Sequence, residues 1–581
     1  MMNRNMNYAS NVKTTGQVEL PKWRARVLFV LLMLVLFLLL IRAVYLQVIH
    51  NGFLQQEGVA RYGRVVDISA HRGKITDRNG EALAISTPVK SVWASPADVE
   101  VTPRQINQIA QLAGISAAEV KNKLADTSRD FVYIKRQLPP EQANKINEMA
   151  VPGVALRHEY RRYYPGGEVT SHILGFTDVD DNGQEGVEFA WQSQLGGKNG
   201  SQRVIIDRRG RIVEDEGSVR VPKPGKDMAL SLDNNMQFIA YREIKEAVEQ
   251  HHAKNGSIVV LDAKSGEILA MANWPSYNPN NREKPSLSMM RNLAVTDVFE
   301  PGSTMKPFTI ASALEAGKIR QNAVIDTRGG VFSVGGRKIH DTHPENTHTV
   351  AQVIQKSSNV GAAKIALLMP AKTFWQSLSD SGFGEPTGSK FPGEAPGKLR
   401  DYKSWRPIEQ ATMSYGNGIS VNLLQLARAY TVFANEGELK QITMLKQEVP
   451  TIGATVYSAA TAQAVRDMLE LVVKPGGTAP LAQVVGYRVA GKTGTSHKLE
   501  NGRYVDKYVA SFVGMAPASN PRLIVAVMLN EPAGKEYYGG QVAAPAFSHV
   551  MGAALRQLNV PNDAPLNNVL QPPKEIIRED A

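Results

Sequence analysis

FEPGSTMKPF, which runs from residue 299 to residue 308, is the most informative segment of this chain. It brings the chain through a turn to Ser303, and Lys306 follows one helical turn later. Pro307 limits where the helix can begin, because a proline inside a helix loses a backbone hydrogen bond. The first helical turn is therefore expected to contain or adjoin Ser303, with Lys306 on the same face. A hydroxyl nucleophile beside a base is an arrangement that supports covalent acyl transfer.

A second motif, Ser357-Ser358-Asn359, lies between two segments with helical patterns. Residues two apart on a regular helix diverge, so a joint role for Ser357 and Asn359 requires a loop there. Ser357 would relay a proton between Lys306 and a leaving amine, and Asn359 would hold a substrate amide. Lys306 must then be neutral for part of the cycle, which burial and nearby positive charge favour.

A third motif, Lys492-Thr493-Gly494-Thr495, is expected on a strand. Lys492 and the threonine hydroxyls would bind a substrate carboxylate, and Gly494 would leave room for a peptide along the strand edge. The backbone N–H of Thr495 would complete an oxyanion hole with that of Ser303.

None of these motifs is specific alone, because similar short patterns occur elsewhere in the chain, at Ser10 to Lys13, Ser276 to Asn278 and Lys264 to Gly266. The order of the three motifs carries the signal. Ser10 lies before the apolar run described below, and Lys264 falls in a predicted hairpin turn upstream of the nucleophile.

Composition narrows the possible functions. The chain has 581 residues, too many for one core, so two or more domains are expected. It has no cysteine, which excludes disulfides, thiolate catalysis and cysteine-bound zinc and suits an oxidising compartment. The net charge of +11 favours acidic partners, including anionic lipid and a carboxylate-bearing cell-wall polymer. No basic run interleaved with aromatics indicates a nucleic-acid site.

Residues 27–49 are apolar apart from Arg42 and Gln47 and form a stretch long enough to span a bilayer, which takes about 20 residues. Residues 1–26 carry an excess of basic side chains, which predicts a cytoplasmic N-terminal tail and places the chain after residue 49 outside. A cleaved signal peptide is the alternative, but no small-x-small cleavage site follows the apolar run. We therefore expect one transmembrane anchor.

The fold class expected for the rest is α+β. Residues 50–228 alternate short strands, at 64–69, 82–86, 89–93 and 131–135, with helices at 102–113 and 140–149. Charged turns at Arg72-Gly73, at 77–80 and at 161–167 are interpreted as structural. Residues 229–560 form a second domain, in which Asp233 caps a helix and 257–262 pairs with 267–272 as a hairpin. Strands at 508–516 and 523–529 and a helix at 543–558 complete an antiparallel sheet flanked by helices, with an all-helical middle. Residues 561–581 are expected to be a flexible tail.

His340, His343 and His348 cluster in one loop. The spacing would suit a metal ion or a pH-sensitive loop, but a polar surface loop explains it more simply. We therefore predict no metal site, no cofactor and at most a modest pH effect.

Together the three motifs resemble the class B penicillin-binding proteins, of the division-specific FtsI type (penicillin-binding protein 3-like). The resemblance covers nearly the entire chain and includes matches at Arg72-Gly73, Asp77-Arg78, Gly80, Arg162-Tyr163-Tyr164-Pro165, His172, Gly175-Phe176, Gly186-Val187-Glu188 and Tyr537-Tyr538-Gly539-Gly540. It implies a membrane-anchored, elongated pedestal domain of the penicillin-binding protein dimerisation type, followed by a periplasmic transpeptidase domain of the penicillin-recognising serine hydrolase fold.

The resemblance also implies a function. Ser303 would attack the penultimate D-alanine carbonyl of a peptidoglycan stem peptide on lipid-linked polymer, Lys306 would be the base and Ser357 the relay. Asn359, Lys492, Thr493, Gly494 and Thr495 would bind substrate, and β-lactams would acylate Ser303. The implied setting is the inner membrane at the septum, with a membrane-embedded glycan polymerase of the FtsW type and other divisome proteins as partners.

Departures from the family pattern are Leu293, where many relatives carry arginine, and the 340–348 loop. They leave open a condition-specific paralogue instead of the main division enzyme. An elongation-type transpeptidase or a D,D-carboxypeptidase would use the same residues, and a divisome scaffold is the non-enzymatic alternative. A class A β-lactamase is disfavoured, because no glutamate after Asn359 has asparagine four positions later.

Overall fold

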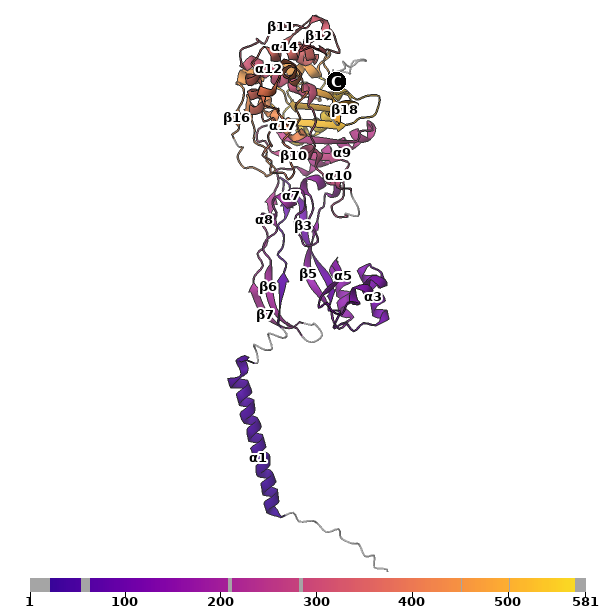
Figure 1. The fold of residues 1–581 in the computed structure, drawn as a ribbon, viewed down its shortest axis with the longest axis vertical. Helices are drawn as coiled ribbons and strands as arrows, with labels where there is room; N and C mark the ends of the chain where they lie inside the picture. The colour runs from indigo at the N-terminus through magenta and orange to yellow at the C-terminus, as the bar shows by residue number, and fades with distance from the viewer. Residues whose placement is uncertain are drawn as a thin grey trace, which may run out of the picture.

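The computed structural model describes residues 21–53, 63–206, 212–281, 286–450, 452–500 and 502–569. Figure 1 shows an N-terminal helix, an elongated middle part and a globular part that contains the C-terminal half of the chain. The α+β class and the order of anchor, pedestal and sheet-containing domain are confirmed, whereas the predicted boundary at residues 228 and 229 stays a prediction.

The apolar run forms a continuous helix. Helix α1 (Lys22–Val44) continues as a π-helical turn, Tyr45–Ile49. The 28 residues contain an 18-residue window with a mean hydropathy of 3.1, none of which is buried inside the protein, so the helix is long and apolar enough to cross a membrane. The predicted cytoplasmic segment lies mostly outside the described residues.

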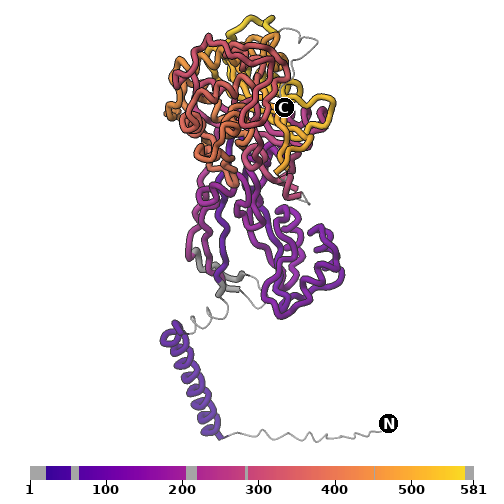
Figure 2. The backbone as a smooth tube through the Cα atoms, turned by 45° about the horizontal axis from the view of Figure 1, so that its top comes forward, coloured from indigo at the N-terminus to yellow at the C-terminus, as the bar shows by residue number. Residues whose placement is uncertain are grey.

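The pedestal contains two sheets. The first is β1 (Gly63–Ile68), β6 (Gly200–Ile206) and β7 (Ile212–Arg220), paired antiparallel. The second is built on β3 (Ala82–Ala94), which pairs with β2 (Ile75–Thr76), β4 (Val132–Leu138) and β5 (Val154–Tyr163), while β8 (Met228–Ala229) pairs with β2. Helices α3 (Pro103–Ala113), α4 (Ala117–Leu124) and α5 (Pro140–Glu148) share a separate apolar core with β3 and β4. Figure 2 shows this helical lobe beside the β6–β7 arm.

Two strands predicted at 82–86 and 89–93 are one strand, β3. Proline usually interrupts a strand because it lacks an N–H donor. Pro88 is tolerated because it pairs only with Tyr160 of β5, between the stretches of β3 that pair with β2 and with β4.

A buried ionic cluster holds the upper pedestal together. Arg72 and Arg162 each donate a hydrogen bond of 2.6 Å to a different carboxylate oxygen of Glu188, and the three side chains are at most 1% exposed. Glu188 lies in α7 (Gly186–Ala190), next to α6 (Ser171–Leu174) and α8 (Gln192–Leu195). Arg72 and Arg162 therefore have a structural role, although Arg162 lies on β5 and not in the turn expected at 161–167.

The pedestal is joined to the second domain by backbone and side-chain contacts. Asp77 accepts from the backbone N–H of Asn234 (3.2 Å), and the N–H of Arg78 donates to the carbonyl of Leu232 (2.9 Å). Asp233 caps α9 (Asn234–Gln250), as the sequence predicted. One apolar core continues from Ile75 through this junction into the second domain, so the two parts share buried surface.

The second domain is built on a five-stranded antiparallel sheet in the order β10-β9-β19-β18-β17. Its strands are β9 (Asn255–Asp262), β10 (Ile268–Trp274), β17 (Ala490–Glu500), β18 (Arg503–Ala516) and β19 (Leu523–Asn530). Helices α9 and α21 (Ala544–Gln557) pack on the sheet, as Figure 1 shows for α9. The predicted hairpin is confirmed, and β17 is an edge strand.

The remaining elements lie mainly between β10 and β17. The helices are α10 (Leu287–Met290), α11 (Leu293–Thr296), α12 (Lys306–Glu315), α13 (Val350–Gln355), α14 (Asn359–Leu367), α15 (Ala371–Asp380), α16 (Pro407–Met413), α17 (Leu423–Ala429), α18 (Thr431–Ala434), α19 (Ala459–Glu470) and α20 (Gly539–Val542). Short strand pairs interrupt them: β11 (Val324–Asp326) with β14 (Thr347–Thr349), β12 (Val331–Val334) with β13 (Arg337–His340), and β15 (Glu438–Leu439) with β16 (Ala454–Thr455). The predicted all-helical middle therefore also contains small two-stranded sheets.

The C-terminal segment corrects one expectation. Residues 561–569, predicted to begin a flexible tail, are docked on the second domain. Asn568 donates to the carbonyls of Val484 (3.1 Å) and Tyr487 (2.9 Å) and accepts from the N–H of Gly486 (2.9 Å). The Asn568 side chain therefore ties the C-terminal segment to the turn at 484–487. The rest of the predicted tail, 570–581, lies outside the described residues.

Candidate active site

Ser303 is the first residue of the candidate site. It lies in a 3₁₀ turn just before the helix that the sequence predicted to contain or adjoin it. Residues Gly302–Met305 form a 3₁₀ turn, η3, and α12 begins only at Lys306, with Pro307 in its first turn. A proline is tolerated there because the first N–H groups of a helix have no internal partner. Ser303 is 2% exposed and Lys306 is fully buried.

Ser303, Lys306 and Ser357 form a closed hydrogen-bonded triangle. The Lys306 Nζ donates to the Ser303 Oγ (2.9 Å), to the Ser357 Oγ (3.0 Å) and to the Ser357 carbonyl (2.5 Å). The Ser357 Oγ lies 3.0 Å from the Ser303 Oγ. The structure therefore brings together the three residues that the sequence assigned to proton transfer, although 51 positions separate Lys306 from Ser357.

Ser357 lies in the loop that its spacing required, between α13 and α14. Its φ of +61° is in the left-handed region, which non-glycine residues adopt at a cost of about 1 to 3 kcal/mol. Ser358 caps α14 by accepting from the N–H of Gly361 (2.9 Å). Asn359 is half-buried and is the first residue of α14, adjacent to this loop.

Asp341 supports this strained loop, although no sequence motif indicates it. Its two carboxylate oxygens accept from the Ser358 hydroxyl (2.6 Å) and from the N–H of Val360 (2.8 Å). Only the histidines of the 340–348 segment drew attention in the sequence. Asp341 follows the first residue of the predicted polar loop. Acidic residues are so common in polar loops that this position alone does not indicate a role.

The third motif lies on β17, as predicted. Lys492 is fully buried and donates to the Thr493 Oγ1 (3.0 Å), which lies 2.7 Å from the Thr478 Oγ1. The Thr495 Oγ1 accepts from the N–H of Gly539 (3.0 Å). These contacts fix the hydroxyls of the strand next to η3.

Gly494 is required for a different reason from the one predicted. A Cβ at this position would lie 2.8 Å from the Pro301 carbonyl and 2.6 Å from the Ser511 Oγ. The nucleophile turn therefore packs directly on the backbone of β17. Gly416 serves a similar purpose on the other side, because its Cβ would lie 2.2 Å from the Gly302 carbonyl.

A row of aromatic side chains lies beside β17 and begins at Tyr508 of the neighbouring strand β18. Tyr508 stacks on Tyr537 at 4.2 Å between ring centroids, and Tyr537 stacks on Tyr538 at 4.4 Å. The three rings are half-buried, and Gly539, which follows them, contacts Thr495. In the sequence the Tyr537-Tyr538 pair stands out only as part of a motif, because nothing local indicates stacking with Tyr508.

The histidine loop is only partly the surface loop expected. His340 is exposed at the end of β13, but His348 is 1% exposed, because its position on β14 points inward opposite Ile325 of β11. Within the part of the chain that the structure describes, no group of three or more histidine, aspartate or glutamate side chains could hold a metal ion.

Comparisons with known proteins agree with this architecture. The family model described as "Penicillin binding protein transpeptidase domain" matches residues 256–552, and the "Penicillin-binding Protein dimerisation domain" matches residues 67–230. The chain is 41% identical to the peptidoglycan D,D-transpeptidase FtsI of Escherichia coli K12, over 93% of each chain. It is 43% identical to the probable peptidoglycan D,D-transpeptidase PenA of Neisseria gonorrhoeae, over 90% of this chain and 91% of the relative.

Solved structures extend the comparison. The transpeptidase domain of Burkholderia pseudomallei penicillin-binding protein 3 is 48% identical and superposes with a TM-score of 0.54, covering 58% of this chain and 98% of that chain. A peptidoglycan synthetase from Bifidobacterium adolescentis, 24% identical, has the same fold over 89% of this chain and 100% of its own, with a TM-score of 0.69. The chain therefore belongs to the family of penicillin-binding proteins that carry a dimerisation domain followed by a transpeptidase domain, as the sequence motifs predicted.

Proposed function

We propose that this protein is a serine-type peptidoglycan D,D-transpeptidase that cross-links stem peptides through an acyl-enzyme on Ser303. The observation that carries the proposal is the buried triangle of Ser303, Lys306 and Ser357, with each side chain within 3.0 Å of the other two. The similarity to FtsI and PenA supports peptidoglycan as the substrate.

In the acylation step, the Ser303 Oγ attacks the carbonyl of the penultimate D-alanine. Its proton passes to Lys306, whose amine must be neutral at that moment, and burial favours the neutral form. Ser357, hydrogen-bonded to both residues, then transfers a proton to the amine of the terminal D-alanine. The C–N bond breaks, terminal D-alanine leaves, and the peptide remains esterified to Ser303.

In the second step, an amine of a neighbouring stem peptide attacks the ester. Its proton returns through Ser357 and Lys306, the C–O bond to Ser303 breaks, and a cross-linked peptide is released. Microscopic reversibility requires the same residues to act in the opposite sense.

The remaining predicted residues would bind substrate. Lys492 and Thr493 supply a cation and a hydroxyl for the terminal carboxylate, and Asn359 would hold a peptide amide. Gly494 lets the nucleophile turn lie against β17, so the N–H groups of Ser303 and Thr495 would together stabilise the oxyanion. A β-lactam would acylate Ser303 in the same way, because its ring amide takes the place of the D-alanine peptide bond.

The anchor sets the cellular location. Lys22, Arg24 and Arg26 precede the apolar part of α1, which favours a cytoplasmic N-terminus in the inner membrane and a periplasmic catalytic domain. By similarity we infer septal action with an FtsW-type polymerase and other divisome proteins. Whether the chain is the main division enzyme or a condition-specific paralogue is tested by complementation of cells depleted of the principal septal transpeptidase.

The direct test uses the full-length protein in detergent with a fluorescent penicillin. Covalent labelling is expected for the parent and is expected to be absent in Ser303→Ala. Labelling of the Ser303→Ala protein would overturn the assignment. Incubation with lipid-linked polymer then separates the activities: cross-linked dimers indicate a transpeptidase, whereas trimmed monomers alone indicate a D,D-carboxypeptidase.

A further inference from the structure

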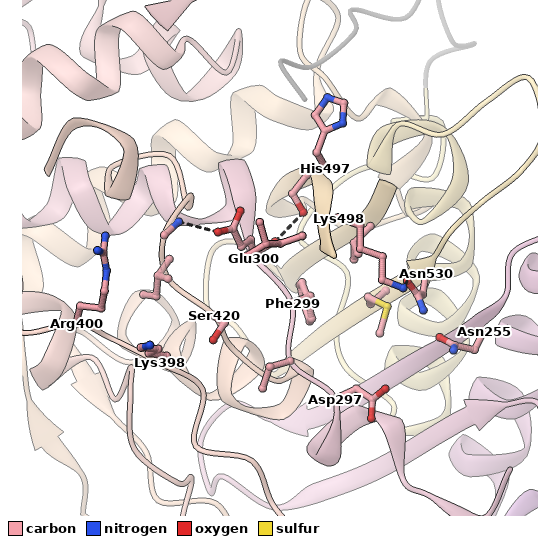
Figure 3. A pocket seen from close by; sticks show the side chains of 17 residues that line it. Asn255, Asp297, Phe299, Glu300, Lys398, Arg400, Ser420, His497, Lys498 and Asn530 are labelled. Carbon is pink, nitrogen blue, oxygen red and sulfur yellow. Dashed lines mark hydrogen bonds between the residues drawn. The ribbon is translucent and has the colours of Figure 1, made fainter. Parts of the chain in front are cut away.

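Glu300 is a half-buried carboxylate that the proposed reaction does not use. It lies three positions before Ser303, in the segment that leads into the nucleophile turn, and it lines a pocket of about 470 Å³. Figure 3 shows Glu300 in the middle of this pocket, between Arg400 and Lys498. A carboxylate that is withdrawn from water needs compensating partners, because burial penalises its charged form. The partners of Glu300 therefore indicate its role.

The carboxylate of Glu300 joins two separate segments of the chain. One of its oxygens accepts from the N–H of Gly418 (2.8 Å), in the loop between α16 and α17. The other oxygen accepts from the hydroxyl of Tyr504 (3.1 Å), near the start of β18. The backbone carbonyl of Glu300 accepts from the Ser496 hydroxyl of β17 (2.8 Å). Glu300 is therefore bonded to the α16–α17 loop and to both strands of the β17–β18 hairpin.

The same segments hold the nucleophile turn through close backbone contacts. In the α16–α17 loop, a Cβ on Gly416 would lie 2.2 Å from the Gly302 carbonyl, and β17 packs on the turn from the other side. Phe299 exchanges two backbone hydrogen bonds of 2.9 Å with Val421, at the end of this loop. Such contacts keep the turn in place only while the loop and the hairpin keep their own positions. Glu300 supplies a side-chain connection between the two.

The electrostatic surroundings of Glu300 suit an ionised carboxylate. Burial raises the pKa of Glu300, whereas the Gly418 N–H, the Tyr504 hydroxyl and Arg400 act against that rise. Burial, reinforced by Glu300, raises the pKa of Tyr504 to about 12, so its hydroxyl stays a donor at neutral pH. Hydrogen bonds to an ionised acceptor are roughly twice as strong as those between neutral groups. The two donors and the carboxylate therefore match one another.

We propose that Glu300 is a positioning residue for the reaction at Ser303: by holding Gly418 and Tyr504, it fixes the nucleophile turn between the α16–α17 loop and the β17–β18 hairpin. In this role it acts through the backbone of the turn and not by contact with the substrate. The inference deepens the proposed function and rests on it. Displacement of a reacting group by about 1 Å can slow a reaction by about 10²-fold, so the acylation rate is a sensitive measure of the position of the turn.

The test measures acylation of the full-length protein in detergent by a chromogenic cephalosporin. Stopped-flow rates at several concentrations separate the dissociation constant of the initial complex from the rate constant of acylation. In Glu300→Ala both side-chain bonds are lost, and we expect acylation to slow by about 10- to 100-fold. The dissociation constant should change by less than about threefold, because the groups proposed to bind the substrate are unchanged.

Two further variants show which bond matters. Glu300→Gln can still accept from the Gly418 N–H, and its amide can donate to the Tyr504 oxygen, so we expect acylation within about fivefold of the parental rate. Tyr504→Phe removes one donor and keeps the bond from Gly418, so its rate should lie between those of the parent and of Glu300→Ala. Melting temperatures are measured for every variant, because a merely structural role would lower stability without this order of acylation rates.

Glu315→Ala is the matched control. Glu315 is the last residue of α12, the helix that follows the nucleophile turn. Its carboxylate also accepts from a backbone N–H (3.1 Å) and from a hydroxyl (2.9 Å), both of Ser458. The substitution therefore removes the same kinds of bond at the far end of the helix, and acylation is expected to match that of the parent.

The inference is overturned if Glu300→Ala acylates at the parental rate, if its loss appears in the dissociation constant and not in the acylation rate, or if Glu300→Gln is as slow as Glu300→Ala. It is also overturned if Glu315→Ala slows acylation equally. Should Glu300→Ala fail to fold, a parental rate in Tyr504→Phe has the same consequence. A parent protein whose Ser303 is not acylated would instead contradict the proposed function, so the two can fail separately.

Discussion

Each of the two domains contains a buried cluster of polar residues, and the two clusters differ in whether a cation is paired with a carboxylate or with hydroxyls. In the pedestal, Arg72 and Arg162 share the carboxylate of Glu188, and opposite charges compensate one another. In the catalytic domain, Lys306 donates to the hydroxyls of Ser303 and Ser357. A buried cation beside a carboxylate is held in its charged form, whereas a buried cation among hydroxyls is more easily deprotonated. The first arrangement stabilises a fold, and the second is the one that we propose for proton transfer.

The largest expected effect comes from removing the amine that we propose as the base. Lys306→Gln keeps a buried polar side chain of similar length but cannot accept the Ser303 proton, so penicillin acylation should slow by about 10² to 10⁴-fold. The melting temperature should stay close to that of the parent. Stopped-flow acylation with a chromogenic cephalosporin measures the rate, and a variant as fast as the parent would exclude Lys306 as the base.

In the pedestal we expect a large loss of stability and no change in the acylation rate. Glu188→Gln leaves two buried arginines without their carboxylate and should destabilise the protein by about 3 to 5 kcal/mol. Molecules that remain folded should still acylate at the parental rate. Denaturant unfolding measures the loss.

The matched control for this variant is Glu119→Gln, whose partner Lys123 lies 2.9 Å away on the exposed side of α4. An exposed pair contributes at most about 1 kcal/mol. Equal destabilisation by the two substitutions would contradict the structural role of the buried cluster.

Packing of the nucleophile turn on β17 gives an intermediate effect. Gly494→Ala places a methyl group against the Pro301 carbonyl and should displace the turn, slowing acylation by about 10²-fold. Gly534→Ala is the control, because a Cβ there meets nothing closer than 3.9 Å. If Gly494→Ala leaves the acylation rate intact while Gly534→Ala behaves like the parent, the turn does not depend on this contact.

A smaller effect is expected at Asp341, which acts through the Ser357 loop. Asp341→Ala should slow the acylation step by about tenfold and change the initial binding of penicillin little, because the loop loses two hydrogen bonds. Asp341→Asn should restore most of the rate, since its amide oxygen can still accept from Val360. Equal effects of the two substitutions on binding and acylation would indicate general unfolding of the loop.

The smallest effect concerns His172, at the junction of the two domains. Burial lowers the pKa of His172 to about 4, from an ordinary value of 6.5, and the ring is hydrogen-bonded to the Met289 carbonyl (2.8 Å). The unfolded chain then binds more protons than the folded one between these values. Stability from this residue is present above about pH 6.5 and is lost as the pH falls toward 4.

His172→Gln should therefore reduce the difference in melting temperature between pH 7 and pH 5, both measured by calorimetry. Glutamine can still donate to Met289, so the variant is expected to fold. An unchanged pH dependence would show that other groups account for acid sensitivity of the junction.

Much of the fold and of the site was predictable because it depends on local pattern. The apolar run of α1, the cap at Asp233 and the hairpin of β9 and β10 were predicted from periodicity and turn residues. The predicted break between strands 82–86 and 89–93 was wrong, because Pro88 pairs only with β5 and so needs no N–H donor on its other side, which only the sheet determines. The prediction for 561–569 was wrong for a similar reason, because the partner of Asn568 is a distant turn.

Local order and residue type were enough to predict the candidate residues of the site: a serine, a lysine one turn later, a polar residue for a relay and a strand with a lysine. Tertiary packing alone set the left-handed backbone of Ser357, the support from Asp341 and the contact between Gly494 and the nucleophile turn. The physical reason is that side-chain type and spacing record which groups are present, whereas angles and distances between remote segments depend on how their surfaces fit together.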